Sequence, residues 1–157
     1  MFMGQYNHTM DTKGRLIVPS KFREQLGEEF VVTKGLDGCL FVYGNGEWEQ
    51  LVEKLRALPL TNQNARKLTR FLMAGAVNCE TDRQGRILIP SNLREYAGIA
   101  KDAVLAGNGS RVEIWSAERW AEEQKIEENV EEIAAELDGL GFILLPSGTY
   151  RCSFRRP

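Results

Sequence analysis

A chain of 157 residues, 43% hydrophobic and 27% charged, has enough apolar material for one ordinary domain or two small fused ones. No apolar run has the length of a membrane-spanning helix, and the first residues lack the regions of a secretory signal. The three cysteines are widely separated and odd in number, which argues against a disulfide framework or a cysteine-rich zinc site. We therefore expect a soluble protein of a reducing cytoplasm.

The net charge of −2 conceals a strong segregation of charge along the chain. Residues 117–138 hold nine acids and two bases, a net charge of −7, which leaves +5 on the remainder. The small overall charge therefore does not exclude a basic surface elsewhere, of the kind that binds nucleic acid.

In chain order, the first expected elements are a strand over residues 4–9 and a motif that the chain contains twice. The motif covers residues 11–24 and 82–95, at an offset of 71 residues. Asp, Gly, Arg, Pro, Ser, Arg and Glu recur at matching positions, and the run between the first Arg and Pro is apolar in both copies. An internal repeat of this kind predicts a duplicated structural unit.

Each copy of the motif predicts a turn, a strand and a short helix. Asp-x-x-Gly is typical of a turn in which the carboxylate accepts backbone N–H groups and glycine takes a positive φ. The three aliphatic residues after the arginine predict a strand buried on both faces, which the next proline ends. Ser20 and Ser91 are expected to N-cap the helices. Arg15 and Arg86 then stand where a rigid turn becomes a strand.

Between the two copies, the pattern predicts a β-hairpin and two helices. Residues 30–33 and 39–43 are the expected strands, joined by a turn with two glycines. Apolar residues three and four apart predict a helix over residues 48–58, which the next proline ends. A second helix is expected over residues 62–73, with a basic face formed by Arg66, Lys67 and Arg70.

After the second copy, the hairpin pattern returns over residues 103–106 and 112–115, and Ser116 is expected to cap a long acidic helix. Trp120 follows Trp48 by 72 residues, so the whole unit is duplicated and not the motif alone. We expect the first repeat with its pair of helices at residues 1–75 and the second repeat with the acidic helix at residues 76–142. Residues 143–157 form a tail that has no counterpart in the first repeat.

Two copies of Asp-x-x-Gly-Arg-[Leu/Ile]-x-[Val/Ile]-Pro-Ser-x-[Phe/Leu]-Arg-Glu resemble swapped-hairpin, AbrB-like DNA-binding modules. Their arrangement in one chain resembles the MraZ family of bacterial transcriptional regulators, as do the stretches 4–9 and 70–76. The resemblance covers roughly residues 1–138. It implies a mixed α+β fold, in which two tandem repeats build a double-psi or swapped-hairpin β-barrel with helices packed outside.

The resemblance also implies a function. It implies a homo-oligomeric ring that binds double-stranded DNA at short direct repeats upstream of the division and cell wall gene cluster, including the protein's own promoter. We therefore expect a sequence-specific transcriptional regulator of the cytoplasm and nucleoid, and not an enzyme. The alternative is a ring-forming scaffold or protein-interaction module with only non-specific affinity for DNA.

Carried onto the motif, the DNA-binding role falls on Lys13 and Arg15 in the first loop and on Arg83 and Arg86 in the second. The arginine fork suits guanine O6 and N7. The alternative is that each arginine only pairs with the motif aspartate and holds the turn. The second loop departs from the first by having Gln84 at the place of Lys13, so the two loops are not equivalent.

Arg23 and Arg94 are secondary candidates for phosphate contact, with a solvated helix face as the other interpretation. No other potential metal ligand lies at ligand spacing from His8, the only histidine. The sequence shows neither an identifiable Ser-His-Asp triad nor a P-loop motif. We therefore expect no catalytic residue, metal or cofactor. The acidic helix is expected to be a solvated face, a shield against DNA or a contact for a basic face of the next protomer. Its apolar stripe predicts that one side is buried, and comprises Trp120, Ile126, Val130, Ile133 and Leu137.

Overall fold

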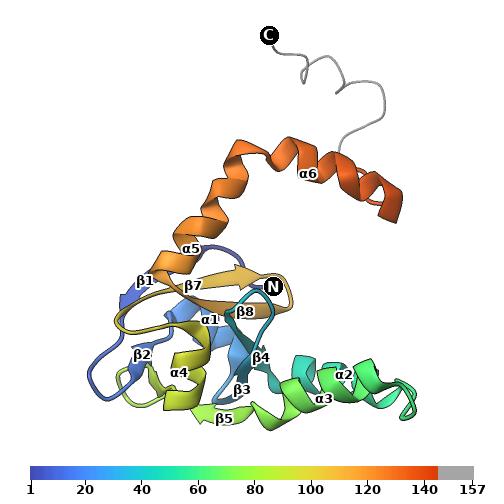
Figure 1. Cartoon of the computed structure of the whole chain (residues 1–157). Coiled ribbons are helices and arrows are strands. Elements are labelled where there is room, and N and C mark those ends of the chain that lie inside the picture. The colour runs from blue at the N-terminus through green and yellow to red at the C-terminus, as the bar shows by residue number, and fades with distance from the viewer. Residues whose placement is uncertain (145–157) are drawn as a thin grey trace. The chain divides into compact units, whose positions relative to one another are not determined.

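The computed structural model describes residues 1–144, and the chain divides into two compact units. The first unit is Met1–Trp120 and contains both copies of the motif; the second begins at Ala121. The helices and strands of the first unit are labelled in Figure 1. In chain order, they are β1 (Gln5–Thr9), β2 (Arg15–Ile17), α1 (Ser20–Leu26), β3 (Glu29–Lys34), β4 (Leu40–Gly44), α2 (Asn45–Arg56), α3 (Gln63–Ala74), β5 (Val77–Glu80), β6 (Arg86–Leu88), α4 (Ser91–Ala97), β7 (Asp102–Asn108), β8 (Arg111–Ser116) and the start of α5 (Ala117–Glu123).

The strands of the two motif copies pair with each other. β2 and β6 form a two-stranded antiparallel ribbon in which Leu16 lies opposite Ile87. Both of these side chains are buried, whereas Ile17 is 38% exposed and Leu88 is 59% exposed. The expectation of strands buried on both faces is therefore wrong. The ribbon has the period-2 alternation of a strand pair with one face on the core and one face in solvent.

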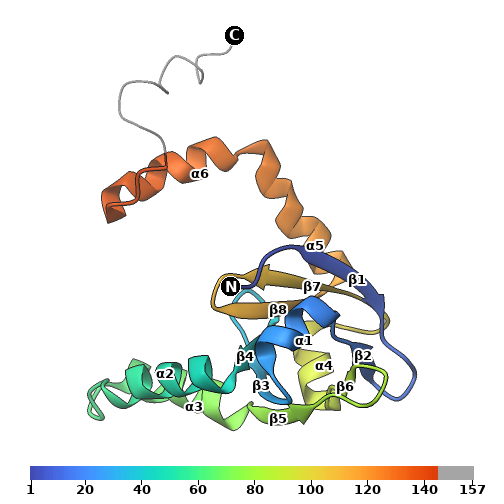
Figure 2. The same ribbon diagram turned by 180° about the vertical axis from the view of Figure 1, so that it is seen from behind.

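The larger sheet is built by exchange of strands between the repeats. Its order is β1-β7-β8-β4-β3-β5, with every pairing antiparallel. β1 of the first repeat pairs with β7 of the second, and β5 of the second repeat pairs with β3 of the first. Figure 2 shows the result from behind, with β1 and β5 on opposite sides of the two hairpins. Neither repeat completes its own sheet.

The expected mixed α+β class is confirmed, and both hairpins form where they were expected, as β3–β4 and β7–β8. The β-ladders place six strands in one sheet and two in the ribbon, with β1 beside β2 and β5 beside β6. The closed barrel stays a prediction. One hydrophobic core fills the space between sheet, ribbon and the helices α1 and α4, with Leu16, Phe22, Phe30, Ile87 and Leu93 among its most buried members.

The helices of the motif begin differently from the prediction. Ser20 and Ser91 are the first helical residues, the preceding prolines hold the N-cap position, and neither helix has a side-chain capping hydrogen bond. The carbonyl of Pro19 accepts the N–H groups of Phe22 and Arg23, both at 2.9 Å. The expected serine caps are therefore wrong. Pro19 has a ψ of 142°, the extended conformation of an N-cap residue, so it holds the N-cap position itself. Ser20 is therefore the first residue inside the helix.

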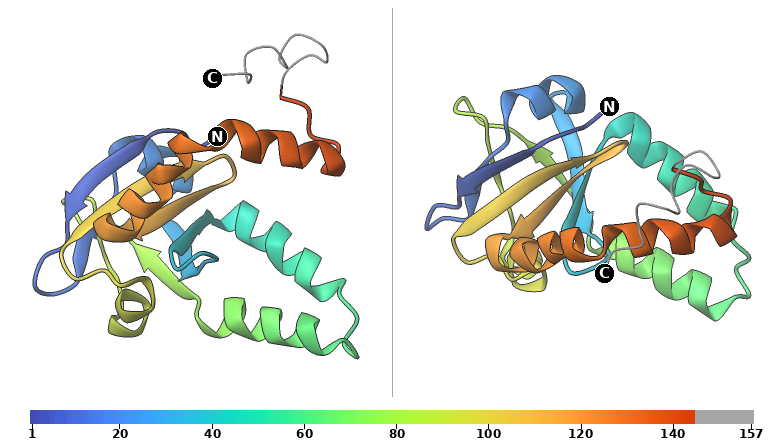
Figure 3. Two further views of the ribbon diagram at one scale, coloured as in Figure 1. Left: turned by 45° about the horizontal axis from the view of Figure 1, so that its top comes forward. Right: turned by 90° about the horizontal axis from the view of Figure 1, so that it is seen from above.

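The helices α2 and α3 form a hairpin that projects from the sheet (Figure 3). The side chain of Asn62 caps α3 by accepting the N–H of Ala65 at 3.0 Å. Trp48 packs its ring 5.9 Å from that of Tyr43, at a second, smaller apolar cluster outside the main core. Trp120 packs against Trp115 in the same cluster, at 5.8 Å. The two tryptophans in equivalent positions thus fix their helices to one apolar layer.

The acidic segment is not the single long helix that was expected. It consists of α5, a 3-10 helix (Gln124–Glu128), α6 (Val130–Glu136) and a final 3-10 helix (Leu137–Leu140) that Gly141 caps. Asn129 breaks the helix with a φ of −140°. The expected cap is confirmed, because Ser116 accepts the N–H of Arg119 at 3.1 Å.

In the second unit, Ile126, Val130 and Leu137 of the expected apolar stripe are exposed within the chain. That this side is buried against some partner stays a prediction. Of the expected tail, residues 145–157 lie outside the described residues. Among residues 1–144, no helix combines the length and the apolar character needed to cross a membrane.

Candidate nucleic-acid interface

The first motif loop is organised by the carboxylate of Asp11. Its Oδ1 accepts the backbone N–H groups of Lys13 and Arg15, at 3.0 and 2.9 Å. Its Oδ2 accepts the Nε–H of the Arg15 side chain at 2.7 Å. The backbone closes the turn through Gly14, whose N–H donates to the carbonyl of Asp11 at 3.0 Å. One aspartate therefore fixes both the turn and the arginine that follows it.

The second loop repeats this geometry. Asp82 Oδ1 accepts the N–H groups of Gln84 and Arg86, at 2.8 and 2.9 Å, and its Oδ2 accepts Nε–H of Arg86 at 2.8 Å. The N–H of Gly85 donates to the carbonyl of Asp82 at 3.0 Å. The sequence reading of Asp-x-x-Gly as a carboxylate-anchored turn is thus confirmed in both copies.

These contacts favour the charged form of both aspartates. The backbone N–H of Arg15, followed by its side chain, lowers the pKa of Asp11 below the ordinary 3.8. The N–H and side chain of Arg86 lower the pKa of Asp82 in the same way. Both carboxylates therefore remain ionised near neutral pH and keep their arginines paired.

The ribbon brings the two arginines together on one exposed face. Arg15 lies opposite Leu88 and Arg86 opposite Ile17, so both guanidinium groups point to the side away from the core. The side chains are 34% and 25% exposed. Nη1 of Arg86 also lies 3.8 Å from Oδ2 of Asp11, an ion pair that joins the two loops.

All four residues predicted to bind DNA therefore belong to one surface. Lys13 and Arg83 are exposed in the loops that precede β2 and β6, and both loops project from the same side of the molecule (Figure 2). The structure shows the aspartate–arginine pairing on which the alternative interpretation of these arginines rests. That pairing uses Nε and does not by itself decide what the outer edge of each guanidinium binds.

Arg23 and Arg94 occupy places that sequence reasoning missed. Each packs against the glycine of the other repeat's loop: a Cβ added to Gly85 would lie 2.8 Å from Cζ of Arg23, and one added to Gly14 would lie 2.9 Å from Cζ of Arg94. Both arginines are half-buried, and not part of an open helix face. No local pattern signals contacts between residues that are 62 and 80 positions apart in the chain.

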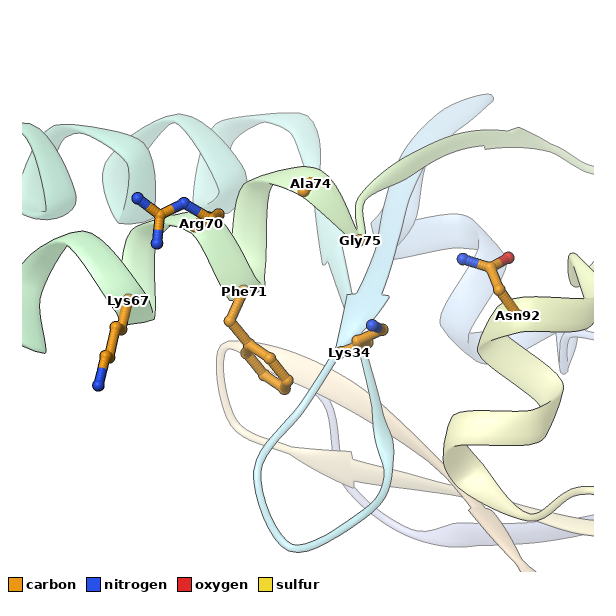
Figure 4. Close-up of a pocket in the computed structure, with 7 residues that line it drawn as sticks. All are labelled: Lys34, Lys67, Arg70, Phe71, Ala74, Gly75 and Asn92. Atoms are coloured by element: carbon orange, nitrogen blue, oxygen red, sulfur yellow. The ribbon is translucent and has the colours of Figure 1, made fainter.

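A second basic region surrounds the C-terminal end of α3, where Figure 4 shows a shallow pocket of about 320 Å³. Its lining includes Lys34, Lys67 and Arg70 but no carboxylate. The ammonium of Lys34 lies 5.8 Å from the ring of Phe71 and 5.6 Å from that of Tyr96. Figure 4 shows the side chains of Lys67 and Arg70 pointing in different directions, so the region is a broad cationic surface and not a convergent ligand site.

In the part of the chain that the structure describes, no group of three His, Cys, Asp or Glu side chains is placed to hold a metal ion. The ribbon face presents the fixed hydrogen-bond donors and the positive charge of its arginines. Such a face is suited to an anionic, hydrogen-bond-accepting partner.

Comparison with known proteins identifies the family. The family model described as "MraZ protein, putative antitoxin-like" matches the chain twice in succession, over residues 1–71 and 72–146. The chain belongs to the MraZ family. Proteins called transcriptional regulator MraZ align with it over most of their length: that of Caldanaerobacter subterraneus is 61% identical over 139 residues, which cover 88% of this chain and 97% of the relative.

Two further MraZ relatives give the same result. The Lachnoclostridium phytofermentans protein is 60% identical over 141 residues, covering 90% of this chain and 98% of its own. The Halothermothrix orenii protein is 55% identical over 142 residues, covering 90% and 99%. Both are called transcriptional regulators, as is the first. Membership in this family confirms the expectation that the chain is not an enzyme.

Proposed function

We propose that the chain is a sequence-specific DNA-binding transcriptional regulator that contacts DNA through the exposed face of the β2–β6 ribbon. Arg15 and Arg86 are the base-reading residues of this proposal, and Lys13 and Arg83 contact the flanking phosphates. The names of the MraZ relatives support the regulatory role. The family resemblance supports short direct repeats in the protein's own promoter, upstream of the division and cell wall gene cluster, as the target.

The observation that carries the proposal is the way in which the two arginines are held. Each motif aspartate engages Nε of its arginine, and within residues 1–144 no hydrogen bond of Arg15 or Arg86 uses Nη1 or Nη2. Those nitrogens are the donors that pair with guanine O6 and N7. Because the aspartate already fixes the side chain, little rotamer entropy remains to be lost when the arginine binds.

Ring assembly, the second part of the proposal, is supported by the small size of this surface. One protomer offers four basic side chains in its two loops, which gives limited affinity at physiological salt. Several protomers in one ring would present the same face repeatedly, and effective concentration would then raise the avidity for DNA that carries several sites. Direct repeats suit protomers related by rotation around such a ring.

The acidic segment supplies a candidate contact between protomers. Residues 121–144 carry eight acids and one base, and several of their apolar side chains are exposed. In contrast, α3 carries three bases and no acid, with exposed apolar side chains at Leu68 and Met73. Charge complementarity therefore supports docking of the acidic segment of one protomer on α3 of another.

The test of the DNA-binding proposal is anisotropy of labelled DNA from upstream of the protein's own gene, with shuffled DNA as competitor. We expect specific binding by the native protein and a loss of about 1–3 kcal/mol in Arg15→Ala, the usual worth of a good bidentate base contact. Arg56→Ala is the matched control, because Arg56 is a 74% exposed arginine of α2 whose one ion pair among residues 1–144 is with Glu53, at 3.3 Å.

Equal binding of Arg15→Ala and native protein would remove Arg15 from the interface. Weak binding of both DNAs alike would favour the alternative function, a ring-forming scaffold with only non-specific affinity for DNA. The aspartate–arginine pairs are the observation that favours this alternative, because they serve to hold the loops even without DNA. Steep salt dependence combined with preference for the upstream DNA would contradict it.

A further inference from the structure

We propose that Arg23 and Arg94 are cross-repeat positioning residues, each of which holds the DNA-binding loop of the other repeat. The inference rests on the proposed function for its consequence in DNA binding, but its geometric basis is independent of DNA. Arg23 belongs to α1 of the first repeat and acts on the second loop. Arg94 belongs to α4 of the second repeat and acts on the first loop.

The space next to each loop glycine is occupied by an arginine of the other repeat. Gly14 and Gly85 have φ values of 85° and 78°, and both are buried. Cβ atoms built on them would lie within 2.8–3.1 Å of Cζ, Nε and Nη1 of the opposing arginine. Each guanidinium plane therefore fills the position that a side chain would take, and closes the turn from the side of the other repeat.

Hydrogen bonds join the two repeats at each of these contacts. Nε of Arg23 donates to the carbonyl of Val18 at 2.9 Å, and the N–H of Val18 donates to the carbonyl of Gly85 at 2.8 Å. The guanidinium of Arg23 thus contacts both Val18 and Gly85, the two residues whose hydrogen bond joins the end of β2 to the second loop. On the other side, the N–H of Ile89 donates to the carbonyl of Gly14 at 2.9 Å, and Arg94 is the arginine at this junction.

The burial of Arg94 distinguishes it from an arginine on an open helix face. Its Nε is fully buried and has no hydrogen-bond partner among the described residues. A purely solvated helix face would leave this nitrogen open to water. Contact with a loop glycine explains the burial of Arg94 and Arg23 better than a solvated helix face does.

The consequence is a crossed dependence between the repeats. Loss of the Arg94 guanidinium should loosen the loop that carries Lys13 and Arg15, although that loop is about 80 positions away in the chain. The loop that carries Arg83 and Arg86, which is close to Arg94 in sequence, should keep its position. A residue that merely stabilised its own helix would not produce this crossed pattern.

The experiment compares native protein with Arg94→Met and Arg94→Lys. Arg94→Met removes a buried Nε that has no partner, so it should keep the fold, which circular dichroism and a thermal melt check. In the absence of DNA, the ¹⁵N–¹H resonance of Gly14 should shift and exchange faster with solvent, while that of Gly85 should stay. Arg23→Met should give the reverse pattern.

Binding to the upstream DNA then tests the functional part. Arg94→Met should weaken binding roughly tenfold through loss of preorganisation, and its effect should be non-additive with Lys13→Ala but additive with Arg83→Ala. Arg94→Lys should fail to restore binding, because an ammonium cannot reproduce the planar contact. Rescue by lysine, with additive effects in both double variants, would identify a phosphate contact and overturn the proposal.

The two failures are distinguishable. If the native protein does not prefer the upstream DNA, the proposed function fails, and the glycine resonances still test the crossed contacts. If the native protein binds specifically but Arg94→Met changes neither the Gly14 resonance nor the affinity, the positioning role fails alone. Equal shifts of Gly14 and Gly85 would show a general loosening of the fold and would also overturn it.

Discussion

The guanidinium of Arg94 occupies the place of the side chain that Gly14 lacks: a Cβ at Gly14 would lie 2.9 Å from Cζ of the arginine. The two residues belong to different repeats, and the contact exists only because the repeats are interlocked through the β2–β6 ribbon. Glycine is favoured at this position for two reasons, its φ of 85° and the space that the guanidinium of Arg94 takes up.

Gly14→Ala should therefore lower stability by more than the positive φ alone explains. Forcing alanine into the left-handed region costs of order 1–3 kcal/mol, to which displacement of Arg94 adds. Gly109→Ala is the control, because Gly109 also has a positive φ, of 72°, and nothing lies within 4 Å of its added Cβ. Urea unfolding of both variants measures the difference. A Gly14→Ala cost equal to that of Gly109→Ala would show that the arginine yields freely.

Asp11→Asn should reduce stability near neutral pH and have little effect in acid. The pKa of Asp11 is lowered in the folded state, so the ionised carboxylate stabilises the fold above the ordinary pKa of 3.8. This contribution disappears as the pH falls through the lowered folded pKa, where the native aspartate is protonated as well. Melting temperatures of both proteins from neutral to strongly acidic pH should converge at the acid end. A constant difference across this range would contradict the ion-pair explanation.

Thr33→Val should loosen the junction between β3 and α3. The hydroxyl of Thr33 is fully buried and donates to the carbonyl of Leu72 at 2.6 Å, so its loss leaves a buried acceptor unpaired. We expect a cost of about 1–3 kcal/mol and faster amide exchange in the last turn of α3. Thr9→Val is the control, because its bond to Asp102 at 3.2 Å is exposed. Equal effects of the two substitutions would contradict this assignment.

Separated repeats should not fold as monomers. Residues 1–75 and 76–144 each lack the partner strand for their first strand, since β1 pairs with β7 and β5 with β3. Each fragment alone should therefore be unfolded or self-associated, and mixing the two should restore the β-sheet signal in circular dichroism. Analytical ultracentrifugation reports the association. A folded monomer of either fragment would show that strand exchange is dispensable.

The local features of the fold were predictable because local residues determine them. Asp11 and Gly14 define their turn within four positions, and the apolar spacing identifies the hairpins and α2. The resemblance to swapped-hairpin modules, and not the spacing of residues, indicated the exchange of strands. Sequence spacing could not reveal that Ile17 and Leu88 face solvent, because their exposure follows from the pairing of two distant strands.

The errors have the same physical origin. Ser20 is a good N-cap residue by type, but the proline before it already holds that position. The acidic helix shows an uninterrupted helical pattern, yet Asn129 breaks it where like charges accumulate on both sides. Arg23 and Arg94 look like surface residues of short helices until the other repeat is placed against them. In each case the neighbouring structure, and not intrinsic preference, decides the outcome.

The pseudo-symmetry of the two loops is incomplete, and this gives the molecule a polarity. The backbones and aspartate–arginine pairs match, but Lys13 corresponds to Gln84 and Thr12 corresponds to Arg83. Two identical loops would read a palindrome equally well in either orientation. Fusion of the repeats in one chain allows each half to diverge in sequence. The two loops of the bound protein would then differ along the double helix, and the protein would have one orientation on its site. All copies on a series of direct repeats would then face the same way, as the repeats themselves do.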